Sequence, residues 1–169
     1  FRSTSTEATS EAAASGSKTD VAFVTDVGNI DDQSFNQYTW QGVQDFCSAN
    51  NLSANYYRPT EDSDAARLEQ MDNAVNDGAK SIVVAGYLFG SAIAEAQEKY
   101  PDVQFLALDV STAEAFAPYP AENDVPADAT VHAYTGSETD AYYLVVNHSG
   151  RDPPRCGVSQ RAVLLYYPF

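Results

Sequence analysis

The chain is 169 residues long, which suits one domain of ordinary size, and its 44% hydrophobic content is enough for a buried core. Its formal net charge of −15 argues against nucleic acid or an anionic membrane surface as a partner, because binding phosphate groups needs a basic face. No run of about 18 apolar residues is present, so we expect no membrane-spanning helix.

Residues 1–19 consist almost entirely of Ser, Thr, Ala, Gly and Glu. Such a segment buries too little apolar surface to offset the entropy that is lost on ordering. We therefore interpret residues 1–19 as a flexible tether, with a segment added for expression as the alternative.

The first predicted strand is the apolar run at 21–25, which is typical of a strand buried in a parallel sheet. A helix should follow from Ser34 to about Asn50, with Asp32 as its N-cap. Cys47 falls on the apolar face of this helix, so we expect a buried, inert thiol. The alternation continues as the strand 52–57, the helix 63–77 ending at Gly78, the strand 81–85, the helix 91–100, and the strands 103–108 and 130–134.

Strands that alternate with helices of this length imply β-α-β units, and hence an α/β fold with a parallel sheet flanked by helices. We place this domain at residues 20–135. Residues 136–169 form an atypical tail, in which Asp152-Pro153-Pro154-Arg155 is incompatible with a helix interior or a central strand. The two cysteines, Cys47 and Cys156, do not amount to a disulfide framework.

Polar side chains follow several of the predicted strands. Ligands of open parallel α/β sheets bind beyond the carboxyl ends of the strands. Asp26 follows the first strand, Phe35 and Asn36 begin the next helix, and Asp109 follows the fourth strand; together with the loop 86–90 they should share one edge of the sheet. Carboxylates accept hydrogen bonds from sugar hydroxyls or purine N–H groups, an amide both donates and accepts, and an aromatic ring offers a stacking face.

Each of these residues also has a purely structural interpretation. Phe35 at a helix start can belong to the core, Asp26 and Asp32 can favour the helix dipole, and Asp109 can be an ordinary loop carboxylate. The segment 26–32 lacks the full calcium-loop pattern, so we expect neither a metal nor a cofactor.

The segment 26–37, followed by Trp40-Gln41-Gly42, resembles the signature of the basic membrane protein family. Its members are substrate-binding lipoproteins of ABC transporters, and the chain is similar to those that bind purine nucleosides. The stretches 77–86 and 105–109 fit the same pattern in the same order. The resemblance covers about residues 20–135 and implies the N-terminal lobe of a type I periplasmic-binding-protein fold.

The resemblance implies a role for each matching residue. Phe35 would stack on the base, Asp26 and Asn36 would hydrogen-bond its edge, and Asp109 would hold the ribose hydroxyls. It also implies a binding protein rather than an enzyme, with a nucleoside ligand and ABC permease subunits as partners. Such a protein is extracytoplasmic and tethered to the bacterial membrane through a lipid on a cysteine, here upstream of this chain.

The resemblance also implies that Tyr87 and Phe89 line the cleft. The family pattern fades after about Thr135, and residues 136–169 cannot build a second lobe, so we interpret them as a truncated or frame-shifted start of that lobe. A ligand-sensing domain of a signalling or regulatory protein is the first alternative function. A doubly wound α/β enzyme is the second, but the chain has no G-x-G-x-x-G, P-loop or nucleophile elbow.

Overall fold

The computed structural model describes residues 18–31, 33–119 and 130–134. Within them, five strands form one sheet in the order β2-β1-β3-β4-β5, and every neighbouring pair is parallel. The strands are β1 (Val21–Val24), β2 (Ala54–Tyr57), β3 (Ser81–Ala85), β4 (Gln104–Leu108) and β5 (Val131–Tyr134). The predicted parallel α/β fold is therefore confirmed, while the predicted tail at 136–169 and all but the last two residues of the predicted tether lie outside the described residues.

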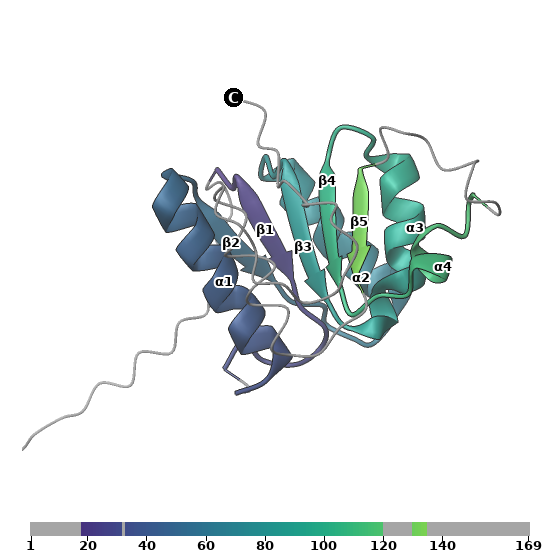
Figure 1. Cartoon of the computed structure of the whole chain (residues 1–169), viewed down its shortest axis with the longest axis horizontal. Coiled ribbons are helices and arrows are strands. Elements are labelled where there is room, and N and C mark those ends of the chain that lie inside the picture. Colours follow the sequence, from purple (N-terminus) through teal and green to yellow (C-terminus); the bar gives the residue numbers. More distant parts are fainter. Residues whose placement is uncertain (1–17, 32, 120–129, 135–169) are drawn as a thin grey trace, which may run out of the picture.

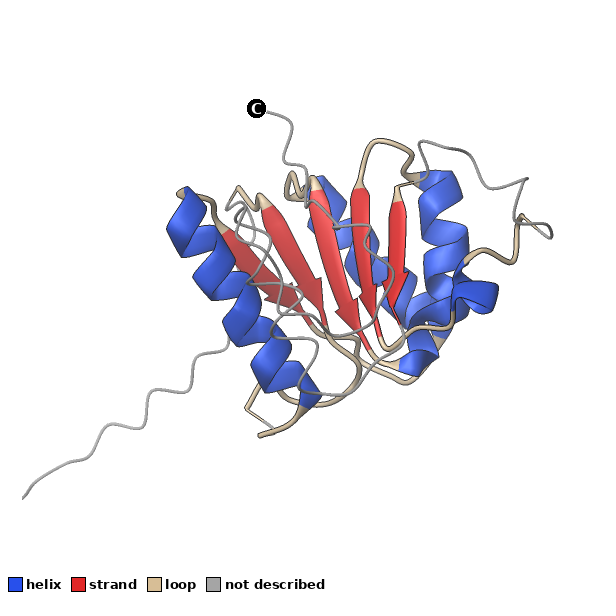
Figure 2. Ribbon diagram, viewed as in Figure 1, coloured by secondary structure: helices blue, strands red, loops and turns tan. Residues whose placement is uncertain are grey.

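Helices cover both faces of the sheet (Figures 1 and 2). The helix α1 (Phe35–Asn50) packs on one face, and α2 (Asp64–Asn76), α3 (Gly90–Lys99) and α4 (Thr112–Ala115) pack on the other. The short 3-10 helix η1 (Tyr87–Phe89) leads directly into α3. All strand arrows in Figure 2 point to the same edge, which is the edge where the sequence predicts the site.

The central strand β1 shows why these residues form a buried parallel strand. Successive side chains of a strand point to opposite faces. Val21 and Phe23 pack in the core under α1, whereas Ala22 and Val24 pack in the core under α2 and α3. Both faces are covered, so an uninterrupted apolar run is required here instead of an alternating one.

The helix ends follow local rules, with one departure from the prediction. Gly78 has a φ of 101°, and the amides of Gly78 and Ala79 donate to the carbonyls of Val75 and Ala74, which is the Schellman arrangement expected at the end of α2. The predicted N-cap of α1 at Asp32 is wrong, because Ser34 occupies the N-cap position. Gln33 has a φ of 55°, which no right-handed helix can include, so the helix begins only after it.

The folded part begins before the predicted boundary at residue 20. Thr19 is buried, its amide donates to the carbonyl of Asp77, and its hydroxyl is hydrogen-bonded to that of Tyr57 at 3.1 Å. Cys47 is buried as predicted, and burial, with a smaller effect of the Asp20 charge, raises the pKa of its thiol to about 12. No helix among the described residues is both long and apolar enough to cross a membrane.

Candidate functional site

The strand register brings the predicted residues to one edge of the sheet. Val24 of β1 pairs with Val84 of β3, which pairs with Ala107 of β4. Asp26 and Asp109 each lie two residues beyond these paired positions, on strands that flank β3. Because neighbouring strands are about 4.8 Å apart, the ends of β1 and β4 are separated by about 10 Å.

Asp26 and Asn36 form the polar centre of this edge. The Asn36 side-chain amide donates to Asp26 Oδ1 at 2.8 Å, and the Gly28 backbone amide donates to the same oxygen at 2.7 Å. Asn36 is only 4% exposed, while Asp26 is half-buried. A carboxylate only accepts hydrogen bonds, so the Asn36 nitrogen must face Asp26 and its carbonyl oxygen must face away. The arrangement therefore leaves Asp26 Oδ2 and Asn36 Oδ1 as further acceptors at the edge.

Gly28 is needed because no side chain fits beside this hydrogen bond. A Cβ atom at position 28 would lie 2.7 Å from Asn36 Nδ2 and 2.7 Å from Asp26 Oδ1. Both distances are well inside van der Waals contact, so the pair would have to separate. The glycine is thus part of the geometry that holds Asp26 and Asn36 together.

Phe35 is the first residue of α1 and is half-buried. It packs against the core cluster under α1, which includes Phe23 and Val43. The structural interpretation of Phe35 as a core residue is therefore observed in part. Its incomplete burial leaves ring surface for a ligand, and the stacking role stays a prediction.

Asp109 directly follows β4 and adopts a left-handed backbone, with a φ of 55°. This conformation costs a non-glycine residue about 1–2 kcal/mol, although aspartate tolerates it better than most side chains. Asp109 is half-buried, and no hydrogen bond in the described structure joins it to Asp26 or Asn36. The structure places Asp109 at the predicted edge, but its role toward a ribose is untested.

Arg58, which the sequence analysis did not single out, binds the loop that carries Asp26. It directly follows β2, the neighbour of β1. Its Nε donates to the carbonyl of Val27 at 3.0 Å, and its Nη1 donates to Asn29 Oδ1 at 2.6 Å. The contact joins residues about 30 positions apart, and no local pattern signals it.

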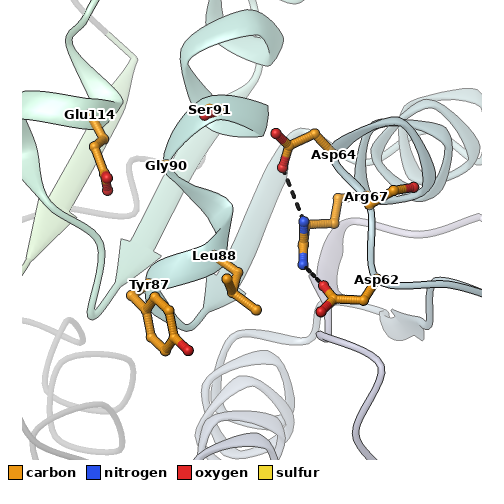
Figure 3. A pocket seen from close by; sticks show the side chains of 9 residues that line it. Asp62, Asp64, Arg67, Tyr87, Leu88, Gly90, Ser91 and Glu114 are labelled. Carbon is orange, nitrogen blue, oxygen red and sulfur yellow. Dashed lines mark hydrogen bonds and ion pairs between the residues drawn. The ribbon is translucent and has the colours of Figure 1, made fainter.

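A cavity of about 440 Å³ opens at the same edge, between the starts of α2 and α3 (Figure 3). Its lining includes Asp62, Asp64, Arg67, Tyr87 and Glu114. Tyr87, expected to line the cleft, does line this cavity and is 70% exposed. Phe89, expected beside it, is fully buried in the core instead.

Arg67 neutralises part of the acidic lining of this cavity. It pairs with Asp62 and, at 3.0 Å, with Asp64 (Figure 3). Its guanidinium lies 5.6 Å from the centroid of the Phe89 ring. Arg67 is 4% exposed, and burying it between two carboxylates avoids the large penalty of an unpaired charge. Among the described residues no group of three or more His, Cys, Asp and Glu could hold a metal ion.

Comparisons with known proteins agree with this architecture. A family model described as ABC transporter substrate-binding protein PnrA-like (Bmp) matches residues 19–145. The CD4+ T-cell-stimulating antigens of Listeria monocytogenes and Listeria innocua are each 36% identical over 94 residues, which is 53% of this chain. The match spans about a quarter (26%) of the length of these relatives.

A solved structure shares the fold. The crystal structure of a lipoprotein fragment from Peptoclostridium difficile 630 superimposes with a TM-score of 0.55, covering 76% of this chain and 93% of the fragment at 18% identity. Polar side chains gathered at the carboxyl edge of a parallel sheet occupy the position where open α/β sheets bind their ligands. Since the family model covers most of the chain, the chain belongs to the Bmp, or PnrA-like, family of ABC transporter substrate-binding proteins, which bind their substrates and are not enzymes.

Proposed function

We propose that this chain supplies the nucleoside-binding lobe of an ABC importer, with a purine nucleoside as ligand. The observation that carries the proposal is the hydrogen-bonded pair of Asp26 and Asn36 at the carboxyl end of β1. Their remaining acceptor oxygens suit the N–H groups on the edge of a purine base. Family membership supports a small-molecule ligand, and the chemistry of the edge supports the nucleoside.

Phe35 and Asp109 complete the proposed binding site. Phe35 offers ring surface beside Asn36, and stacking on a base is worth about 1–3 kcal/mol. Asp109 lies two strands away from Asp26, on the far side of β3, and its carboxylate accepts hydrogen bonds from the ribose hydroxyls. This separation of about 10 Å accommodates a base at one end and a sugar at the other.

The proposal extends to partners and location. ABC permease subunits receive the ligand, and the binding protein acts outside the cytoplasm, held to the membrane by a lipid on a cysteine upstream of this chain. The relatives are much longer than the matched region, so these properties belong to the whole protein.

Chemical-shift mapping of this chain by NMR tests the ligand. Inosine, guanosine and adenosine should shift the amides of Gly28, Asn36 and Asp109, with a dissociation constant in the millimolar range, or about −4 kcal/mol. Affinity is low because the described edge is open, with Val27 and Tyr87 exposed, so contacts compete with water. Ribose and glutamine serve as controls. Shifts from glutamine but not from nucleosides, or nucleoside shifts confined to the opposite edge near Lys80, would contradict the proposal.

A further inference from the structure

We propose that Arg58 is a positioning residue for the nucleoside site: it fixes the loop from Val27 to Asn29 in the conformation that binds ligand. The inference rests on the proposed function, because it concerns the same site. Arg58 directly follows the neighbouring strand β2 and touches neither Asp26 nor Asn36 in the described hydrogen bonds. It acts on them through the loop.

The loop is held at both ends, because Asp26 follows β1 and Ile30 packs against the core cluster under α1. The residue before it, Asp26, is anchored by β1, whose pairing with β2 extends to the hydrogen bond from the Thr25 amide to the Tyr57 carbonyl. Within the loop, the Gly28 amide donates to Asp26 Oδ1. The two residues that flank Gly28, Val27 and Asn29, are exposed to solvent. Exposed loop residues without further contacts are mobile, so an additional restraint is needed to keep Gly28 in place.

Arg58 supplies that restraint on both sides of Gly28. One nitrogen binds the carbonyl of Val27 and another binds the side chain of Asn29, so a single rigid plane holds two points of the loop. The register explains how it reaches them: Tyr57 pairs with Val24, so Arg58 emerges beside the start of the loop. A lysine has one flexible ammonium group and cannot reproduce the fixed two-point contact.

The consequence for binding is one of preorganisation. When the loop is already fixed, the ligand does not have to order it on binding, and the affinity is higher. When Arg58 is removed, Asp26 and Asn36 keep their identities and their anchors in β1 and α1. The loss should therefore appear in the loop and in ligand affinity, and much less in overall stability, since Arg58 is exposed.

Three variants of this chain test the inference: Arg58→Ala, Arg58→Lys and, as a control, Lys80→Ala. Lys80 is an exposed cation immediately before β3. The Lys80→Ala substitution therefore removes the same charge as Arg58→Ala, but at the opposite edge of the sheet. The readouts are ¹⁵N order parameters of Val27, Gly28 and Asn29, the dissociation constant for inosine from NMR titration, and the melting temperature.

We expect the loop order parameters to fall from about 0.85 to below about 0.6 in Arg58→Ala. Inosine affinity should fall about fivefold to tenfold, which corresponds to about 1–1.4 kcal/mol. Arg58→Lys should lie between wild type and Arg58→Ala in both readouts, and Lys80→Ala should match wild type. Melting temperatures of the four proteins should agree within about 2 °C.

Several outcomes overturn the inference. Unchanged order parameters in Arg58→Ala would show that Arg58 does not fix the loop. A mobile loop with unchanged inosine affinity would show that the loop does not matter for binding. Equal losses of affinity in Arg58→Ala and Lys80→Ala would assign the effect to overall charge. If wild type gives no inosine shifts at Gly28 or Asn36, the proposed function fails and the positioning role with it, even where Arg58 still orders the loop.

Discussion

The Asn36 amide donates to the Asp26 carboxylate at 2.8 Å and thereby joins the start of α1 to the end of β1. Asn36 is almost completely buried, so the bond forms largely out of water. A hydrogen bond to a charged group contributes about 1.5–3 kcal/mol in such a setting. The same bond fixes the orientation of both side chains at the proposed site.

Replacing Asn36 by aspartate should make the site sensitive to pH. Two carboxyl groups would then share the space of one hydrogen bond, and both cannot stay ionised. At pH 7 we expect a loss of about 2–4 kcal/mol in the free energy of unfolding. Part of this loss should be recovered as the pH falls toward 5 and one proton is shared. Urea unfolding at both pH values measures the change, and Asn36→Ala, which cannot share a proton, should show no such recovery.

Gly28→Ala should separate Asp26 from Asn36. The new methyl group would lie 2.7 Å from atoms of both side chains, and relieving that contact should cost about 1–3 kcal/mol and weaken nucleoside binding. A double-mutant cycle with Asn36→Ala identifies the cause, because removing the amide removes one of the two clashes. The cost of Gly28→Ala should be smaller in that background. Equal costs in both backgrounds would show that the strain arises elsewhere in the loop.

Two substitutions at Phe35 separate its packing from its proposed stacking. Phe35→Ala should lower both stability and nucleoside affinity, because the ring packs against the core. Phe35→Leu keeps most of the apolar contact but removes the aromatic face. We expect its melting temperature to stay within a few degrees of wild type, about 4 °C at most, while nucleoside shifts in the NMR titration disappear. Full binding by Phe35→Leu would restrict Phe35 to a core role.

Tyr57 should make the protein less stable at alkaline pH. Burial, together with the neighbouring Asp77, raises the pKa of Tyr57 to about 12 even though the Thr19 hydrogen bond lowers it. The folded pKa exceeds the ordinary value of 10.0, so its contribution is fully present below pH 10 and is lost as the pH rises through about 12. Over this window the loss amounts to about 2–3 kcal/mol.

Chemical denaturation of wild type and Tyr57→Phe between pH 9 and 12 measures this effect. Tyr57→Phe should be less stable by about 1 kcal/mol at pH 9, because the hydrogen bond to Asp77 is lost. The difference should vanish or reverse toward pH 12. Tyr38→Phe is the control, since Tyr38 is exposed on α1. A constant difference across the range would refute the prediction.

Cys47 should resist alkylation in the native protein. Its thiol is buried and has a pKa of about 12, so almost none of it is the reactive thiolate at pH 8. We expect iodoacetamide to modify Cys47 at least about 100-fold more slowly in buffer than in guanidinium chloride. Peptide mapping by mass spectrometry distinguishes Cys47 from Cys156. Comparable rates in the two conditions would mean that α1 opens readily.

The sheet and its helices could be predicted because their signals are local. Apolar runs such as 21–25 and 81–85 are required by burial on both faces, and Gly78 is required by the left-handed backbone at the end of α2. The helix α4 was not predicted, since four residues are too few to show helical periodicity. The N-cap of α1 was misplaced because the positive φ of Gln33 has no sequence signal of its own.

The site was predictable only where one motif contains its residues. Asp26, Gly28 and Asn36 lie within eleven positions, and the structure joins them by hydrogen bonds. Arg58 and Arg67 were not foreseen, because what each guanidinium meets is decided by how distant elements pack. The segment 63–77 was correctly predicted as a helix, yet nothing in it shows that Arg67 would be buried over Phe89.

The strand order also bears on how the chain can fold while it is being synthesised. β1 and β2 pair first along the chain, and β3 then joins the open side of β1. β4 joins β3, and β5 joins β4, so the sheet grows at one edge in the order in which its strands leave the ribosome. Among the five described strands, none has to insert between two that are already paired. Assembly from the N-terminus onward therefore needs no rearrangement of earlier pairings.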